Sequence, residues 1–425
     1  MTHQPTAPST SSTHPAGLYV LFFTELWERY SFYALMALLT LYMNEKLEFS
    51  LEKTAQVYGA FLGAVYFLPL IGGFLADRWL GFYRAVIIGA VLMGLGQFVL
   101  STGGGTTFFL ALGLIACGTG MLKPNVSNIV GGLYIDRPQI RDAAFNIFYM
   151  GINTGAFIAP FVVAWLRKYY GWNAAFMSAA VAMVFALLVF TLGKRYLPAA
   201  AQKTDRAADA ANGPTPDAFL RIVALLVVFV IVIAFWVAFY QNGFTLTLWA
   251  RDNTATSISP ETFQFVNPLG IILFSPLLVM LWNALRRRGS EPSTVSKIIL
   301  GMLLTAATFG IMAAAGMAGG DTGRVSAGWL ISAYLVIALG EICLSPMGLS
   351  LVTKVAPARH RGTMMGAWFV ATAAGGYLSG FVGQYWNTMS HSRFFLLVAG
   401  LCVVAAVLMG IAKARLDKVF ARAGA

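Results

Sequence analysis

The sequence is divided into twelve apolar segments, each long enough to cross a lipid bilayer as a helix. The hydrocarbon core of a bilayer is about 30 Å thick, and a helix needs about 20 apolar residues to span it. The chain of 425 residues is 58% hydrophobic and only 11% charged, whereas soluble domains are about 25% charged. We therefore expect an all-α membrane protein with twelve transmembrane helices, near residues 17–43, 57–76, 84–102, 107–133, 142–166, 172–193, 218–249, 262–285, 293–318, 326–353, 362–389 and 393–412.

The 29 basic residues indicate how the chain is oriented in the membrane. Cytoplasmic loops of membrane proteins carry an excess of Lys and Arg. Twenty basic residues lie in the loops after even-numbered segments or near the C-terminus, seven lie in the loops after odd-numbered segments, and Arg29 and Lys123 lie inside segments. We expect a multi-pass protein of the cell (inner) membrane with both termini in the cytoplasm. The net charge of +12 is then a topology signal, and no nucleic-acid partner is expected.

A polar stretch at 197–217 separates two halves that weakly repeat. Gly118–Pro124 (GTGMLKP) matches Gly340–Pro346 (GEICLSP), and Arg141–Phe161 matches Arg361–Phe381 at Arg, Gly and Phe positions. Parallel six-helix halves are typical of major facilitator transporters, whose substrate site lies between the halves; the alternative is chance recurrence. We expect a disordered cytoplasmic tail at 1–16, six-helix bundles at 17–196 and 218–415, a cytoplasmic linker at 197–217 too short for extra helices, and a cytoplasmic tail at 416–425.

The stretch Gly72–Arg84 (GGFLADRWLGFYR) resembles the signature between the second and third helices of the same superfamily. This resemblance implies a gating role for Asp77 and Arg78, through a charge contact made in only one conformational state. The alternative is an ordinary charged helix end.

Five charged residues lie well inside apolar segments: Glu25, Glu28, Arg29, Lys123 and Glu341. Burying a charge at bilayer depth costs at least about 2.5–3.5 kcal/mol, so we expect them to face one hydrated cavity. The spacing of the first three places them on one helical face. Three negative and two positive charges are balanced by one proton, which favours proton-coupled uptake of a molecule that carries a carboxylate. The alternative is a static ion-pair network between helices.

Polar and aromatic residues accompany these charges. Asn153, Asn267 and Ser345 are candidates to line a pathway, because an unpaired amide or hydroxyl in hydrocarbon is costly. Tyr66, Trp236 and Trp368 are candidate aromatic walls, although packing or lipid contact is the more common role of an aromatic residue in a membrane helix.

Several stretches resemble signatures of the proton-dependent oligopeptide transporter (POT) family: ELWERYSFY, GTGMLKPNVS, FYMGINTGAF, FWVAFYQNG, FVNPLGI and GEICLSPMGLS, within residues 17–390. The resemblance implies import of di- and tripeptides driven by the proton gradient. It implies proton coupling by Glu25, Glu28, Arg29, Lys123 and Glu341. It implies that Arg29 and Lys123 face the peptide carboxylate, that Glu341 faces the peptide ammonium with Asn153 and Asn267 nearby, and that Tyr33, Tyr66, Trp236, Ser345 and Trp368 line side-chain pockets.

Three positions depart from the family pattern. The first Tyr of the motif is Phe32, an Arg common three residues after Tyr33 is Met36, and the usual acidic residue before Gln241 is Tyr240. The missing Arg and acid form an outer gate salt bridge in many members. Losing both leaves no unpaired buried charge, so we expect the outer gate to close through packing of Met36 against Tyr240.

The sequence also leaves alternatives to peptide symport. The same fold can carry nitrate, another small anion or zwitterion, or export drugs against protons, although Glu341 favours a zwitterion. An enzyme using Glu25 and Glu28 is disfavoured, because both carboxyls would lie on the same side of any bond. Cys117, Cys343 and Cys402 lie in apolar segments, where a thiol is usually a packing residue. We expect no enzymatic activity, no metal, no cofactor beyond the coupling proton, and no partners beyond di- and tripeptides and the lipid bilayer, with no obligate protein partner.

Overall fold

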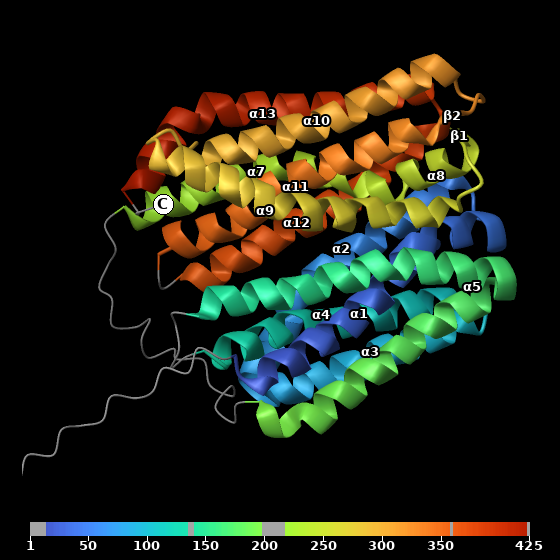
Figure 1. Cartoon of the computed structure of the whole chain (residues 1–425), viewed down its shortest axis with the longest axis horizontal. Coiled ribbons are helices and arrows are strands. Elements are labelled where there is room, and N and C mark those ends of the chain that lie inside the picture. Colours follow the sequence, from blue (N-terminus) through green and yellow to red (C-terminus); the bar gives the residue numbers. More distant parts are fainter. Residues whose placement is uncertain (1–13, 135–139, 198–216, 358–359, 423–425) are drawn as a thin grey trace, which may run out of the picture.

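The structure is a computed structural model that describes residues 14–134, 140–197, 217–357 and 360–422. It is nearly all helical, and Figure 1 shows long helices running side by side. By length and composition, ten helical segments of the described residues could cross a membrane. The 26-residue α1 is similarly long but carries Glu25, Glu28 and Arg29 in its middle.

The described residues of the first half form five α-helices and three short helical turns. Their bounds are α1 Ala16–Leu41, η1 Tyr42–Lys46, α2 Leu51–Leu75, η2 Ala76–Leu80, α3 Phe82–Ser101, α4 Phe108–Gly132, α5 Arg141–Leu192 and η4 Gly193–Tyr196.

The second half contains the remaining helices and two very short strands. Their bounds are α7 Ala218–Phe239, η5 Tyr240–Gly243, α8 Thr245–Asp252, β1 Thr254–Ala255, η6 Pro260–Phe265, α9 Val266–Arg287, α10 Thr294–Gly319, β2 Val325–Ser326, α11 Ala327–Val355, α12 Arg361–Gly383, η8 Gln384–Asn387 and α13 His391–Ala421.

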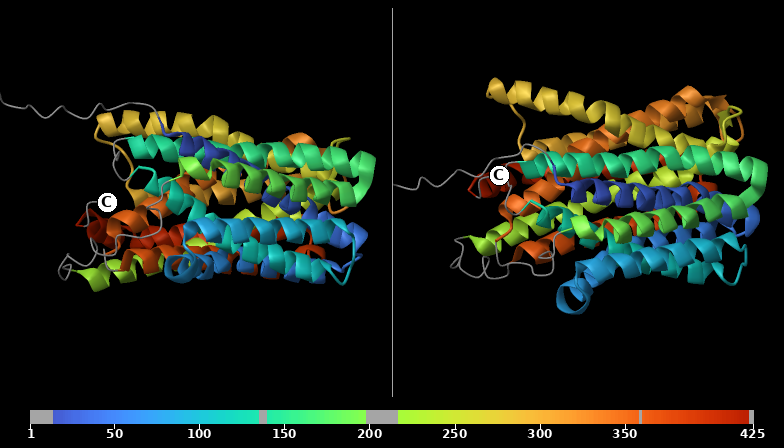
Figure 2. Two further views of the ribbon diagram at one scale, coloured as in Figure 1. Left: turned by 90° about the horizontal axis from the view of Figure 1, so that it is seen from below. Right: turned by 60° about the horizontal axis from the view of Figure 1, so that its bottom comes forward.

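The molecule has two distinct ends. The C-terminus lies at one end, called here the terminal end, and α8, β1 and β2 lie at the opposite, distal end (Figure 1). Figure 2 shows the same division from two other sides. The first turn of α1 packs against η4, so the described start and end of the chain belong to the terminal end.

The long element α5 contains a single break at Gly171. The sequence predicts two helices there, near 142–166 and 172–193, and the two arms of α5 on either side of Gly171 correspond to them. At Gly171 the backbone adopts φ 83° and ψ −178°, a conformation essentially limited to glycine. One residue therefore makes the whole turn between two antiparallel arms.

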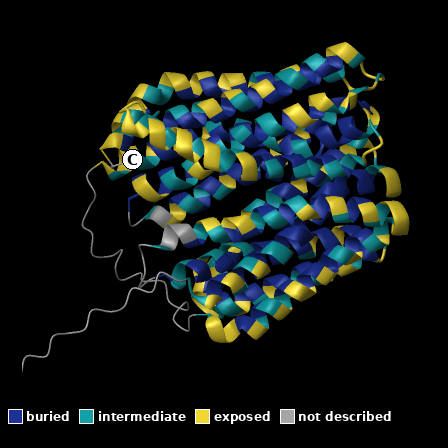
Figure 3. Cartoon of the chain, in the orientation of Figure 1, coloured by how far each residue is buried: buried dark blue, intermediate teal, exposed yellow. Residues whose placement is uncertain are grey.

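Buried residues face neighbouring helices, and exposed apolar side chains cover much of the outer surface (Figure 3). A surface of exposed Leu, Val, Ile and Phe suits contact with lipid tails. Within the first half, α1 packs on α5 and α3 packs on α4, and within the second half α10 packs on both α11 and α13.

The contact between α3 and α4 depends on two glycines. A Cβ atom at Gly118 would lie 2.6 Å from the carbonyl oxygen of Gly89 and 2.6 Å from the backbone nitrogen of Met93. Membrane helices approach this closely only where small residues meet.

We expect Gly118→Ala to lower the melting temperature of the protein in detergent, because overpacking a tight contact costs about 1–3 kcal/mol. Gly113 lies on the same helix, and a Cβ there would meet nothing within 4 Å. Gly113→Ala is therefore the matched control and should leave the melting temperature unchanged or slightly higher. Equal melting temperatures for the two variants would contradict the packing described for Gly118.

Two features differ from the all-α expectation and its boundaries. The strands β1 and β2 pair in parallel, with Thr254 opposite Val325, because Asn253 ties the two loops by donating to the carbonyl oxygen of Asp321 at 2.9 Å. The last helix runs to Ala421 rather than ending near 412, and so extends past the bundle boundary expected at 415, since Lys413 pairs with Asp417 one turn further on. Most of the tail expected at 1–16 and of the linker expected at 197–217 lies outside the described residues.

Candidate functional site

Three charged side chains cluster on α1. Arg29 donates from Nε and Nη2 to the two carboxylate oxygens of Glu28, and its Nε lies 3.4 Å from Oε1 of Glu25. All three side chains are at most 4% exposed. One guanidinium is therefore shared by two carboxylates, and α1 carries an excess negative charge at this point.

Lys123 on α4 is the second cation of the site. Its ammonium lies 4.6 Å from the ring centroid of Tyr66 on α2, a favourable cation–π geometry. It also lies within electrostatic range of Glu25, Glu28 and Arg29. Among the described residues, no carboxylate lies within ion-pair distance of Lys123, so this cation keeps an open position for an anion.

Tyr33 and Tyr66 connect the first half of the chain to the second. Tyr33 lies within electrostatic range of both Arg29 and Glu341, and so does Tyr66. Both tyrosines are half-buried. The structure thus brings the α1 charges, the two tyrosines and Glu341 of α11 into one neighbourhood, although they come from positions more than 300 residues apart.

Glu341 is the carboxylate of the second half. Its Oε2 accepts a hydrogen bond of 3.3 Å from Nδ2 of Asn267 on α9, and no cation of the described residues lies within ion-pair distance of it. Ser345, one turn further along α11, is half-buried. Glu341 is therefore a carboxyl group that no cation of the described residues pairs with.

Aromatic residues pack beside this region in the second half. The ring of Trp236 on α7 stacks on Tyr240 with centroids 5.6 Å apart and lies 6.5 Å from Trp368 of α12. Trp236 Nε1 is buried with no hydrogen-bond partner in the described part of the chain. Since an unsatisfied buried donor is costly, this N–H group is available to donate a hydrogen bond to a ligand.

Asn153 is already engaged within its own helix: on α5, its amide donates to the carbonyl oxygen of Tyr149 at 2.9 Å.

The predicted gating residues lie in two places. Asp77 and Arg78 are exposed in η2 and line a cavity of about 960 Å³ at the terminal end, together with Arg84, Lys194 and Arg195. Met36 and Tyr240 are 7% and 5% exposed on the distal side of the charged residues. The two gating pairs therefore lie toward opposite ends of the molecule.

Contacts between the halves surround Tyr240. The hydroxyl of Tyr58 on α2 donates to the Tyr240 carbonyl oxygen at 3.0 Å, and the Thr40 hydroxyl on α1 donates to the Gly243 carbonyl oxygen at 2.7 Å. Tyr58 and Thr40 could not be predicted as contact residues from the sequence, because their partners are backbone carbonyls about 180 to 200 residues away and no local pattern marks them.

The burial of α9 changes along its length. Its buried residues are Val266, Asn267, Pro268, Gly270 and Ile271, all in its first two turns. From Ile272 onward the described helix is half-buried or exposed. The part of α9 that carries Asn267 is therefore packed inside the protein, and its later turns are not.

Comparison with known proteins identifies the family. A family model described as "POT family" matches residues 83–213 and 214–398. A di-/tripeptide transporter of Lactococcus lactis subsp. cremoris is 30% identical over 94% of this chain and 95% of its own length. The peptide transporter YePEPT of Yersinia enterocolitica is 32% identical over 93% of each chain.

A solved structure gives the same answer for the fold. The crystal structure of a peptide transporter POT in complex with sulfate superposes with a TM-score of 0.88, at 30% identity, covering 96% of each chain. Sequence and structure agree over nearly the whole length of the protein. The chain belongs to the POT family.

Proposed function

We propose that this protein is a proton-coupled symporter that imports di- and tripeptides by alternating access. The observation that carries the proposal is the pair of uncompensated charges, Lys123 in the first half and Glu341 in the second. A short peptide at neutral pH carries a carboxylate and an ammonium, which complement these two charges. Membership of the POT family and the similarity to di-/tripeptide and peptide transporters support the same substrate class.

Proton coupling follows from the α1 cluster. Glu25, Glu28 and Glu341 oppose only Arg29 and Lys123, so one carboxyl of the site is readily protonated. A substrate carboxylate that engages Arg29 or Lys123 competes with Glu25 and Glu28 for positive charge and favours uptake of a proton. Substrate and proton then bias the same conformational equilibrium. The remaining substrate-lining roles are those named above for Tyr33, Tyr66, Asn153, Trp236, Asn267, Ser345 and Trp368.

The proposed architecture is the major facilitator fold with twelve spans in two six-helix bundles. Besides the other long helices, α1 and the two arms of α5 each supply one span, and α7 continues through η5 into α8 as one. We propose that the terminal end, with both termini, lies in the cytoplasm, which the excess of basic residues in the loops there supports, and that the protein belongs to the cell (inner) membrane. The protein is a transporter and not an enzyme.

The proposal is tested in proteoliposomes. An inside-alkaline gradient should drive accumulation of labelled dialanine, and excess unlabelled dialanine should suppress it whereas nitrate should not. Suppression by nitrate would favour an anion carrier, and absence of gradient-driven uptake across a broad panel of di- and tripeptides would refute peptide symport.

A further inference from the structure

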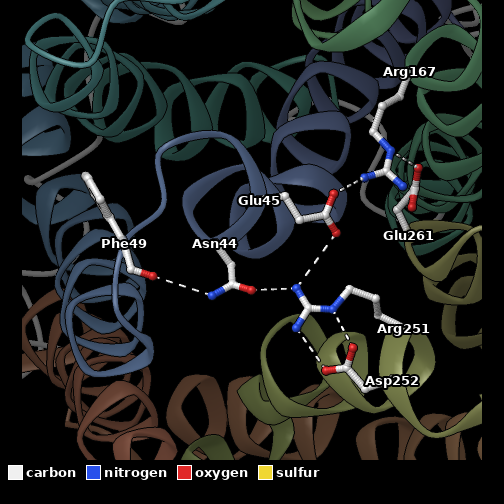
Figure 4. Close-up of polar contacts among 7 residues, drawn as sticks. All are labelled: Asn44, Glu45, Phe49, Arg167, Arg251, Asp252 and Glu261. Atoms are coloured by element: carbon white, nitrogen blue, oxygen red, sulfur yellow. Dashed lines mark hydrogen bonds and ion pairs between the residues drawn. The ribbon is translucent and has the colours of Figure 1, made fainter.

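Five charged side chains meet at the distal end of the molecule (Figure 4). They are Glu45 of η1, Arg167 of α5, Arg251 and Asp252 of α8 and Glu261 of η6, and we call them the distal ionic cluster. Arg167 lies 3.0 Å from Glu45 and 2.8 Å from Glu261, and Arg251 lies 3.8 Å from Glu45.

The cluster joins the two halves of the chain twice. Arg167 belongs to the first half and pairs with Glu261 of the second, whereas Arg251 belongs to the second half and faces Glu45 of the first. Arg251 Nη1 also donates to the side-chain oxygen of Asn44 at 2.5 Å. Separation of the halves at this end must break all three contacts.

The contact between Arg167 and Glu261 is the shielded one. The side chain of Glu261 is 0% exposed and that of Arg167 is 19% exposed, whereas Glu45 and Arg251 are 35% and 27% exposed. Exposed ion pairs contribute little, but removing one partner of a buried pair is strongly destabilising because it strands the other charge. Most of the effect of the cluster is therefore expected from Arg167 and Glu261.

Aromatic side chains accompany this ion pair. The Arg167 guanidinium lies 4.7 Å from the ring centroid of Trp172. Beside it, Phe161 of α5 packs on Phe265 of η6 with centroids 4.5 Å apart, which is a second contact across the halves. Polar and apolar contacts thus coincide where α5 meets η6.

The two arginines of the cluster come from loops that hold few basic residues. Only seven of the 29 basic residues lie in distal loops by the sequence count, as the orientation rule predicts. Two of these seven, Arg167 and Arg251, are used in contacts between the halves. Nearer the site, Met36 and Tyr240 carry no charge that could join the halves.

We propose that the distal ionic cluster is an electrostatic latch of the outer gate, with the buried pair Arg167–Glu261 as its main element. The latch forms when the distal ends of the halves close and breaks when they separate, where water hydrates the freed charges. It adds a charge contact to the packing of Met36 and Tyr240. The inference rests on the alternating access of the proposed function, and its test measures conformation without measuring transport.

The test is a distance measurement by pulsed electron resonance in lipid nanodiscs. Spin labels are placed at Glu52→Cys, at the start of α2, and Asn387→Cys, at the end of η8, after Cys117, Cys343 and Cys402 are replaced. Both labelled positions are exposed, and α2 contacts η8 across the halves. The label distance therefore lengthens when the distal end opens.

Arg167→Gln should raise the ratio of long to short label distances at least about tenfold, because it strands the buried carboxylate of Glu261. Arg167→Gln combined with Glu261→Gln should restore much of the short distance, since no charge is then stranded. Arg286→Gln is the matched control: Arg286 pairs with Glu291 at 2.6 Å within the second half, and its loss should leave the distances unchanged.

Unchanged distances in Arg167→Gln would overturn the latch. The latch would also be overturned if the free-energy change of opening in the double variant equalled the sum of the changes in Arg167→Gln and in Glu261→Gln, because the two side chains would then act independently. Equal opening in Arg286→Gln would attribute the effect to charge loss in general and would also overturn it. Failure of peptide transport in the unmodified protein would refute the proposed function, and the label distances would still report whether the cluster holds the distal end closed.

Discussion

Glu28→Gln protein in proteoliposomes is expected to lose gradient-driven accumulation of dipeptide down to the level of protein-free vesicles, while exchange of labelled for unlabelled dipeptide remains measurable. Glu28 is 0% exposed and its carboxylate accepts both hydrogen bonds from Arg29. A glutamine keeps the shape but cannot gain or lose a proton. Substrate binding and the conformational cycle can then continue, and only the link to the proton gradient is removed.

The control for this experiment is Glu52→Gln. Glu52 is an exposed carboxylate at the start of α2 whose side chain contacts Gln56 one turn away, so its loss should change neither accumulation nor exchange. If Glu28→Gln still concentrated dipeptide against its gradient, the α1 cluster would not be the proton-coupling group. If it lost exchange as well, Glu28 would be required for binding or for folding.

The second large effect is expected from Glu341→Gln and depends on the ligand. We expect dialanine to bind about 10- to 100-fold more weakly, since a hydrogen bond to a charged group contributes about 1.5–3 kcal/mol. N-acetyl-dialanine lacks the ammonium, so it should bind the variant and the unmodified protein equally. Binding is measured by competition against a labelled dipeptide or by calorimetry.

Lys123→Gln provides the complementary control for the ligand comparison. In this variant, N-acetylation should still weaken binding, because Glu341 is intact, whereas amidation of the peptide C-terminus should weaken binding less than in the unmodified protein, because only Arg29 is left to face the carboxylate. The assignment of opposite peptide ends to Lys123 and Glu341 is wrong if N-acetylation weakens binding as much in Glu341→Gln as in the unmodified protein.

The charged part of the site could be predicted from the sequence because its pattern is local. Residues three and four apart share a helical face, so Glu25, Glu28 and Arg29 had to lie together on α1. The closest contact of Arg29 is nevertheless with its neighbour Glu28. Adjacent residues point in different directions from a helix, and only the flexibility of the two long side chains allows this pairing.

The distal ionic cluster could not be predicted in the same way. Glu45, Arg167 and Glu261 lie about 100 residues apart in separate connections, and each resembles an ordinary charged loop residue. Its assembly depends on how the two halves meet, which no local periodicity encodes. The end of α13 was missed for a different reason: its last turns are charged, but buried Leu416 and Phe420 hold them in place.

The turn at Gly171 has a mechanical consequence. Only Gly171 departs from helical torsions between the two arms of α5, so the arms are joined without a long loop and their ends stay together at this turn. Arg167 lies one helical turn before Gly171, so it belongs to a helix of the first half and not to a pliable loop.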